Sequence, residues 1–149
     1  MDELTAIKNR FEIYKWSGKK KQYLPYYETR ISAGFPSPAD DYAEKKIDLN
    51  EKLVKHPEAT FFVKVDGDSM IDCGICSGDI LLVDRAVEAR DGKIIVAVLN
   101  GEFTVKRLKT KNQKYYLVPE NQRYRIIEIT EEDDFEIWGV VTSVIREMK

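Results

Sequence analysis

Residues 60–70 read Thr60-Phe61-Phe62-Val63-Lys64-Val65-Asp66-Gly67-Asp68-Ser69-Met70. Apolar side chains recur at every second position up to Val65, and Gly67 ends the alternation, so the pattern predicts a strand that runs into a turn. Ser69 would therefore lie on a turn, where backbone N–H groups are not paired in a sheet. A serine nucleophile with an adjacent oxyanion site needs this setting. Serine is also an ordinary turn residue, because its hydroxyl binds neighbouring backbone groups, and the stretch alone leaves both interpretations open.

A lysine on a later strand can complete such a site. It lies in Gly101-Glu102-Phe103-Thr104-Val105-Lys106-Arg107-Leu108, where apolar and polar side chains alternate as in a strand. A strand lysine is usually solvated. Burial lowers a lysine pKa from about 10.4, because loss of water penalises the ammonium form. Ser69 and Lys106 are therefore candidates for the nucleophile and the general base of a Ser–Lys dyad.

Further motifs surround these two residues. Met70 is followed by Ile71-Asp72-Cys73-Gly74-Ile75-Cys76-Ser77-Gly78-Asp79. Upstream lie Ala33-Gly34-Phe35-Pro36-Ser37-Pro38-Ala39-Asp40-Asp41-Tyr42 and Ile47-Asp48-Leu49-Asn50. Together with the serine and lysine motifs, these segments resemble the LexA and UmuD group of self-cleaving serine peptidases, and the upstream segments are similar to the cleavage region of its UmuD-like members. The resemblance covers roughly residues 31–149.

The resemblance implies a site and a reaction. Ser69 would be the nucleophile, Lys106 the general base, and the backbone N–H groups of Asp68 and Ser69 the oxyanion hole. The scissile bond would join Ala33 to Gly34, because family members are cut between a small residue and glycine. Cleavage would leave a shortened form that serves a translesion DNA polymerase in the SOS response. We expect neither a cofactor nor a metal ion.

The resemblance also implies partners. These are a second copy of the chain in a homodimer, a RecA filament on single-stranded DNA that stimulates cleavage, and a UmuC-type Y-family DNA polymerase. Two alternatives stay open: a non-enzymatic dimeric module that binds a polymerase whatever its cleavage state, and the peptidase domain of a LexA-like regulator. Residues 1–30 show no helix-turn-helix pattern, which argues against a repressor of the LexA type.

The segment that would be cut has the composition of an extended linker. Gly34, Pro36 and Pro38 exclude a helix over residues 31–41 and favour extended backbone. A protease needs its substrate extended, and the small pair Ala33 and Gly34 can enter a narrow site. Without the serine and lysine motifs, a linker that nothing cuts would be an equally good interpretation.

Composition limits the range of functions. The chain has 149 residues, of which 43% are hydrophobic, and this suits one small domain with an appendage. The formal net charge is −2, and only residues 1–30, with seven Lys or Arg against four acidic residues, could make weak phosphate contacts. Direct sequence-specific DNA binding is therefore not expected. No apolar run reaches the roughly 20 residues that span a membrane, which predicts a cytoplasmic protein and separates the chain from membrane-anchored signal peptidases with a similar dyad.

Two cysteines and one histidine could carry other chemistry. Cys73 and Cys76 have the spacing of a redox pair or half a zinc site, but zinc needs four ligands and the chain has no second cysteine pair. A redox pair would open a helix after a strand, whereas these residues precede a predicted strand, so we expect two reduced cysteines. His56 is the only histidine and thus the only candidate for a Ser–His mechanism, a role that its place before Pro57 in a polar connection does not favour.

The predicted fold is mainly β. Strand patterns cover residues 60–66, 79–84, 93–99, 102–108, 114–118, about 124–128 and 135–145, and Asn100-Gly101 is a hairpin signal. About seven short strands predict a compact, twisted β domain over residues 59–149, and the resemblance implies a LexA/signal-peptidase-like catalytic fold. Residues 1–58 would form a mobile, extended N-terminal arm, because residues 1–30 follow no helical or strand period. A short helix or coil is expected within residues 41–56.

Overall fold

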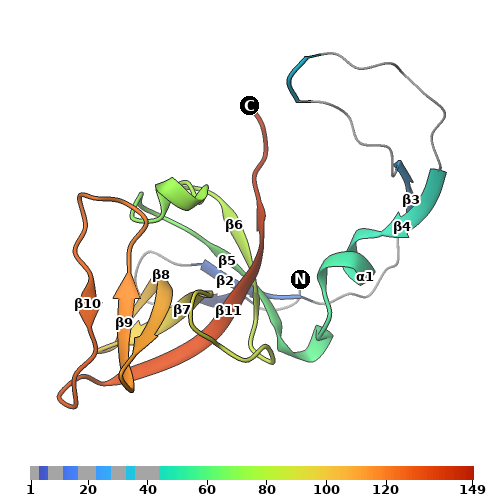
Figure 1. Cartoon of the computed structure of the whole chain (residues 1–149). Coiled ribbons are helices and arrows are strands. Elements are labelled where there is room, and N and C mark those ends of the chain that lie inside the picture. Colours follow the sequence, from blue (N-terminus) through green and yellow to red (C-terminus); the bar gives the residue numbers. More distant parts are fainter. Residues whose placement is uncertain (1–3, 7–11, 17–22, 28–32, 36–43) are drawn as a thin grey trace. The chain divides into compact units, whose positions relative to one another are not determined.

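The computed structural model of the protein describes residues 4–6, 12–16, 23–27, 33–35 and 44–149 (Figure 1). The chain divides into two compact units, residues 1–17 with 56–149 and residues 18–55. Among the described residues, the first unit holds a sheet of nine strands, and the second holds a two-stranded sheet and a short helix. The chain is therefore mainly β, which confirms the predicted fold class.

The nine strands are antiparallel to their neighbours and lie in the order β1, β2, β5, β6, β11, β7, β8, β9, β10. Their bounds are Leu4–Ala6 (β1), Glu12–Lys15 (β2), Thr60–Lys64 (β5), Ile80–Asp84 (β6), Ile94–Leu99 (β7), Glu102–Lys111 (β8), Lys114–Val118 (β9), Ile127–Glu128 (β10) and Phe135–Ile145 (β11). Two short 3-10 helices, Pro57–Ala59 and Ile71–Cys73, precede β5 and β6 in the chain.

Strands β5 to β11 confirm the seven strands predicted for residues 59–149, with shifts of a few residues at their ends. Strands β1 and β2 differ from the predicted boundary at residue 58, because they extend the same sheet. β2 pairs with β5, and its Ile13, only 2% exposed, packs in the core with Val63. A strand of four residues gives little periodic signal, but β5 offers it unpaired backbone groups at the sheet edge.

Two clusters of buried side chains stabilise the sheet. Strand β7 contributes to both, because alternate side chains point to opposite faces: Val96 belongs to the first cluster, and Ile95 and Ala97 belong to the second. The first cluster also contains Met70 and Ile75, which come from the loop that carries Ser69. The candidate nucleophile is therefore part of a loop that is fastened to the core.

Strand β11 pairs with β6 on one side and with β7 on the other (Figure 1). Its register shifts between Ile137 and Gly139 on the β7 side. At Gly139 a Cβ atom would come within 2.5 Å of Val83 Cγ1 and 3.2 Å of Arg85 Cγ. Only glycine therefore fits this position of the central strand without displacing its neighbours.

Replacing Gly139 by alanine should lower the free energy of unfolding by about 1–3 kcal/mol, the usual cost of overpacking a well-filled interior. Urea denaturation followed by circular dichroism measures the change. Val144→Ala alters an exposed position of the same strand, and it should shift the stability by no more than about 0.5 kcal/mol. Equal stability of the Gly139 variant and the parent would contradict the close packing at this position.

The second unit contains β3 (Tyr23–Tyr27) and β4 (Glu44–Asp48), which pair antiparallel, followed by α1 (Leu49–Leu53). Asp48 caps the helix, because its carboxylate accepts a hydrogen bond from Asn50 N at 3.0 Å. Residues 33–35 form an exposed bend. The rest of the predicted linker, 31–32 and 36–41, lies outside the described residues, as does much of the predicted arm. Within the described ranges, no helix is long and apolar enough to cross a membrane.

Candidate active site

Ser69 lies in a loop, residues 66–78, whose two ends are joined by backbone hydrogen bonds. Val65 N donates to the Asp79 carbonyl at 2.9 Å, and Gly78 N donates to the Val65 carbonyl at 2.7 Å. Gly67 opens the loop with a φ of 111°, a conformation that would strain any residue with a side chain. Gly67, which ends the apolar alternation in the sequence, therefore also allows the turn that follows β5.

Two apolar side chains fix this loop to the protein interior. Met70 is 2% exposed and Ile75 is 1% exposed, and both pack in the first core cluster. Both side chains therefore anchor the loop from its inner side. Because Met70 directly follows Ser69, the half-buried Ser69 is held on a fixed turn.

The structure brings Ser69 and Lys106 together. Lys106 Nζ, from the middle of β8, donates a hydrogen bond to Ser69 Oγ at 3.0 Å. It also donates to Thr104 Oγ1 at 2.8 Å and to the Val105 carbonyl at 3.0 Å. A neutral amine has two N–H groups and one lone pair. With its N–H groups on Thr104 and Val105, its lone pair would face the Ser69 hydroxyl, as a general base requires.

Burial favours the neutral form of this amine. Lys106 is 8% exposed, and no carboxylate in the described part of the chain forms an ion pair with it. Loss of water therefore lowers the pKa of Lys106 from its ordinary value of 10.5. More of the amine is therefore neutral near pH 7 than in a surface lysine, which favours the form that a base needs.

The family resemblance predicts an oxyanion hole at the backbone N–H groups of Asp68 and Ser69. Within the part of the chain that the structure describes, neither group donates a hydrogen bond to a protein acceptor. Both belong to the turn that carries Ser69 Oγ. Free amides beside a nucleophile can stabilise the negative oxygen of a tetrahedral intermediate.

Ser69 and Lys106 open onto a pocket of about 120 Å³. Phe103, Tyr124 and Asp68 are among the other residues that line it. Typical ligand cavities measure about 300–1,000 Å³, so this pocket suits a side chain as small as alanine. Among the described residues, no three His, Cys, Asp or Glu side chains converge as metal ligands would.

Known proteins share this chain's sequence over most of its length. The profile of the Peptidase S24-like family matches residues 25–142. The chain belongs to the Peptidase S24-like family. Proteins of this family are, in general, self-cleaving serine peptidases.

Individual relatives show which members of the Peptidase S24-like family this chain is similar to. Protein MucA of Salmonella typhimurium is 43% identical over 140 residues, which cover 93% of this chain and 95% of MucA. Protein SamA of Salmonella typhimurium is 43% identical over 125 residues, 84% of this chain and 86% of SamA. The LexA repressor of Bordetella parapertussis is 41% identical over 118 residues, 78% of this chain but 54% of the repressor. These matches confirm a UmuD-like member of the family.

The alternative base lies elsewhere in this Peptidase S24-like fold. His56 precedes β5, whereas Ser69 follows that strand at its other end. The His56 ring instead contacts the buried Asp84, with Nδ1 2.6 Å from Oδ2. The structure therefore does not bring His56 to the Ser69 hydroxyl.

The two cysteines are both free. Cys73 Sγ donates to the Met70 carbonyl at 3.1 Å, and burial raises the pKa of the Cys73 thiol from its ordinary value of 9.0. A thiol with a raised pKa is protonated near neutral pH and is a poor nucleophile. Cys73 therefore does not compete with Ser69 for that role.

Ala33 and Gly34, the predicted scissile pair, lie in the exposed bend of the second unit. Sequence patterns did not single out Thr104 or residues 120–124, which contact the lysine and the serine loop. Thr104 lies two positions before Lys106, and the alternation of a strand could have indicated their shared face. Residues 120–124 carry no comparable signal, because their contacts join segments about fifty positions apart.

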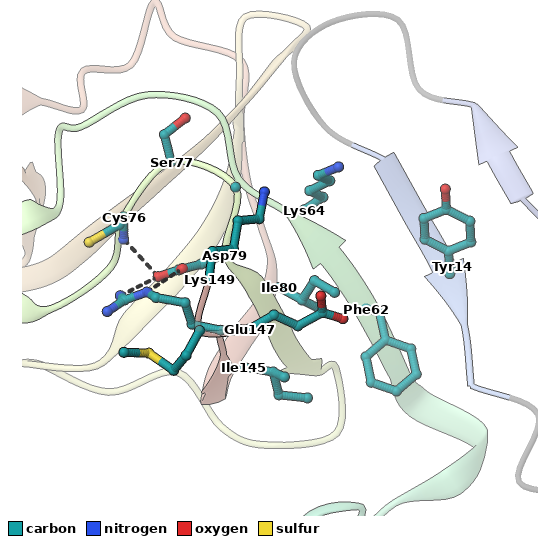
Figure 2. A pocket seen from close by; sticks show the side chains of 13 residues that line it. Tyr14, Phe62, Lys64, Cys76, Ser77, Asp79, Ile80, Ile145, Glu147 and Lys149 are labelled. Carbon is teal, nitrogen blue, oxygen red and sulfur yellow. Dashed lines mark hydrogen bonds and ion pairs between the residues drawn. The ribbon is translucent and has the colours of Figure 1, made fainter.

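A larger hollow of about 1000 Å³ lies in the first unit (Figure 2). Ile80 and Ile145 face it from β6 and β11. The Asp79 carboxylate accepts a hydrogen bond from Cys76 N at 2.7 Å and from Arg146 Nη2 at 2.6 Å. The Arg146 guanidinium holds the pKa of Asp79 below its usual range. Asp79 thus links the serine loop to the C-terminal segment, which is a structural role.

Proposed function

We propose that this protein is an autoproteolytic serine endopeptidase that cuts its own chain between Ala33 and Gly34. The observation that supports it most directly is the 3.0 Å separation between Lys106 Nζ and Ser69 Oγ, which lets the neutral amine accept the hydroxyl proton. The small pocket and the free amides of the serine turn support the same chemistry. Membership of the Peptidase S24-like family supports the reaction class.

The first half of the reaction forms an acyl-enzyme. Neutral Lys106 takes the proton of the Ser69 hydroxyl while Oγ attacks the carbonyl carbon of Ala33. The N–H groups of Asp68 and Ser69 bind the oxygen that becomes negative. Lys106, now an ammonium, gives its proton to the nitrogen of Gly34, and the C–N bond breaks. Ala33 is left as an ester of Ser69, and Gly34 becomes a new N-terminus.

The second half restores the enzyme. Neutral Lys106 takes a proton from a water molecule, which attacks the ester carbonyl. The same backbone N–H groups hold the second tetrahedral intermediate. Ser69 leaves with the proton from Lys106, and the Ala33 carboxylic acid releases its remaining proton to solvent and becomes a carboxylate. One water is consumed, and the dyad returns to its starting state.

For the biological role, we propose SOS mutagenesis in the cytoplasm. The homodimer would be cleaved when it meets a RecA filament on single-stranded DNA, and the shortened form would serve a UmuC-type translesion DNA polymerase. The net charge of −2 favours a damage signal that arrives through a protein over direct reading of DNA. The filament would favour the cleavage-competent placement of the segment, which is a shift in population and supplies no catalytic group.

Mass spectrometry of the purified protein tests this function. The protein is aged alone, with a RecA filament on single-stranded DNA, and with the same DNA without RecA. A fragment that begins at Gly34, formed faster with the filament only, is the expected result. Equal stimulation by bare DNA would refute the filament as the signal. If no condition produced a fragment, the non-enzymatic polymerase-binding module would be the better function.

Gly34→Val should block cleavage and leave the dyad intact. The Ala33 carbonyl must come within attack distance of Ser69 Oγ, and a β-branched side chain at Gly34 would obstruct that approach. Rates of fragment formation, measured at alkaline pH without RecA, should fall below detection. Ser37→Val adds the same side chain three residues downstream and should be processed like the parent. Normal cutting of Gly34→Val at the same bond would exclude this scissile site.

A further inference from the structure

Residues 120–124, which follow β9, make hydrogen bonds to the loop that carries Ser69. Glu120 N donates to the Ser69 carbonyl at 2.8 Å, and Asn121 Nδ2 donates to the Asp68 carbonyl at 2.9 Å. The Tyr124 hydroxyl donates to the Asp68 carboxylate at 2.6 Å. The segment thus binds the carbonyl groups of the two residues whose amides would form the oxyanion hole.

The contact from Asn121 affects the proposed oxyanion hole through the rigid peptide group that joins Asp68 to Ser69. A peptide group is planar and trans, so the C=O of Asp68 and the N–H of Ser69 point in opposite directions. The Asp68 carbonyl accepts two hydrogen bonds, one from the Asn121 amide at 2.9 Å and a longer one from Ile71 N at 3.2 Å. Together they set the direction of this carbonyl and thereby also that of the Ser69 N–H. A hydrogen bond at the carbonyl also polarises the N–H and strengthens it as a donor. We propose that Asn121 is a positioning residue that aims the Ser69 N–H at the oxyanion, an inference that rests on the proposed peptidase function.

Both ends of the Asn121 side chain have complementary partners. Oδ1 accepts a hydrogen bond from Arg123 N at 3.0 Å, which closes a local turn. Nδ2 is then directed to the Asp68 carbonyl. The turn fixes the side chain, and the side chain fixes the peptide group next to Ser69. Asn121 is half-buried, so water competes weakly for these bonds.

The same segment contacts the strand of the general base. The Glu120 carboxylate accepts a hydrogen bond from Arg107 Nε at 2.5 Å, and Arg107 directly follows Lys106 on β8. Arg107 also donates to the Gly92 carbonyl at 2.6 Å. Residues 120–124 therefore join the serine loop to the lysine strand. Catalytic groups must be held within about 0.5 Å of their working geometry, and this connection sets the oxyanion donor relative to the dyad.

Two substitutions separate the roles of the Asn121 side chain. Asn121→Asp keeps an oxygen for Arg123 N and loses the donor to the Asp68 carbonyl, whereas Asn121→Ala loses both. Both variants should cut themselves about 10- to 100-fold more slowly than the parent at every pH, because removal of an entire oxyanion donor costs about 10²–10³-fold. The apparent pKa of the rate curve, which Lys106 sets, should not move in Asn121→Ala, because this variant adds no charge beside the dyad. Urea denaturation should show both variants fully folded under the assay conditions, because the buried anchors of the serine loop, Met70 and Ile75, are unchanged.

Asn112→Asp makes the same chemical change in the exposed turn between β8 and β9 and should cleave at the parental rate. A parental rate in Asn121→Asp would overturn the inference. So would a slow Asn121→Asp beside a parental Asn121→Ala, since charge alone would then explain the effect. A shifted apparent pKa in Asn121→Ala would mean that Asn121 acts through Lys106, which also overturns it. A parent chain that never cleaves itself would refute the proposed function and, with it, this inference.

Discussion

Replacing Ser69 by alanine is expected to abolish self-cleavage and leave the sheet intact. The change removes the atom that attacks the Ala33 carbonyl, together with one hydrogen bond from Lys106. The loop keeps its buried anchors, Met70 and Ile75. Rates at alkaline pH should fall by more than about 10³-fold, because loss of one member of a unit that acts together removes most of its catalysis. Intact-mass analysis measures the fragment, and circular dichroism checks the fold.

Lys106→Met should have an equally large effect on the rate. Methionine matches the length of the lysine side chain and removes its amine. Because the buried amine has no carboxylate partner among the described residues, the variant should unfold at a higher urea concentration near neutral pH. The double variant with Ser69→Ala should be no slower than either single variant, since both changes disable one step.

Lys109→Met is the matched control, because Lys109 lies on the same strand with an exposed side chain. It should cleave itself at the parental rate. Self-cleavage by Ser69→Ala or Lys106→Met at the parental rate would show that the reaction does not use this dyad. Loss of cleavage in all three lysine and serine variants would point to a general effect on the fold.

The strands of the first unit were largely readable from the sequence. Alternation of side chains marked β5 and β8, and turn residues such as Gly67 and Asn100 marked where strands end. These signals are local, because the backbone of a strand sets the period and a turn needs particular residues. The alternation of side chains does not predict that Ser69 and Lys106 lie close together in space. That prediction came from the resemblance to a known family.

Contacts between distant segments could not be predicted in the same way. Nothing in residues 4–15 marks β1 and β2 as strands of the main sheet, because their pairing depends on the free edge of β5. Likewise, Asn121 looks like an ordinary turn residue in the sequence. Its contact with Asp68 appears only when β9 and the serine loop are placed side by side.

The rate of unassisted self-cleavage should rise with pH and level off once Lys106 is neutral. Lys106 can take the Ser69 proton only as a free amine, and the ammonium form is inactive. Below the Lys106 pKa the neutral fraction grows about ten-fold per pH unit. Burial lowers that pKa from 10.5, so the curve should level off at a lower pH than a solvated lysine would give. First-order fragment formation, measured from pH 6 to 10, gives the curve.

The same shift predicts how stability depends on pH. The folded state has the lower Lys106 pKa, so the unfolded state binds more protons between that value and 10.5. Stability from this group therefore rises with pH across that window, and the penalty for burying the ammonium is fully present below it. In Lys106→Met this part of the rise should be missing. A parent and a Lys106→Met variant with the same pH dependence of unfolding would contradict a lowered pKa.

A histidine base would give a different curve on the same plot. A Ser–His enzyme levels off near the ordinary histidine pKa of about 6.5, whereas the lysine mechanism still gains rate above neutral pH. His56 is engaged with Asp84 at the far end of β5, so His56→Ala should leave the curve unchanged. The reaction should also be first order at two protein concentrations, because the segment and the dyad belong to one chain or one dimer. A plateau below pH 8 that vanished in His56→Ala would replace the lysine mechanism with the histidine one.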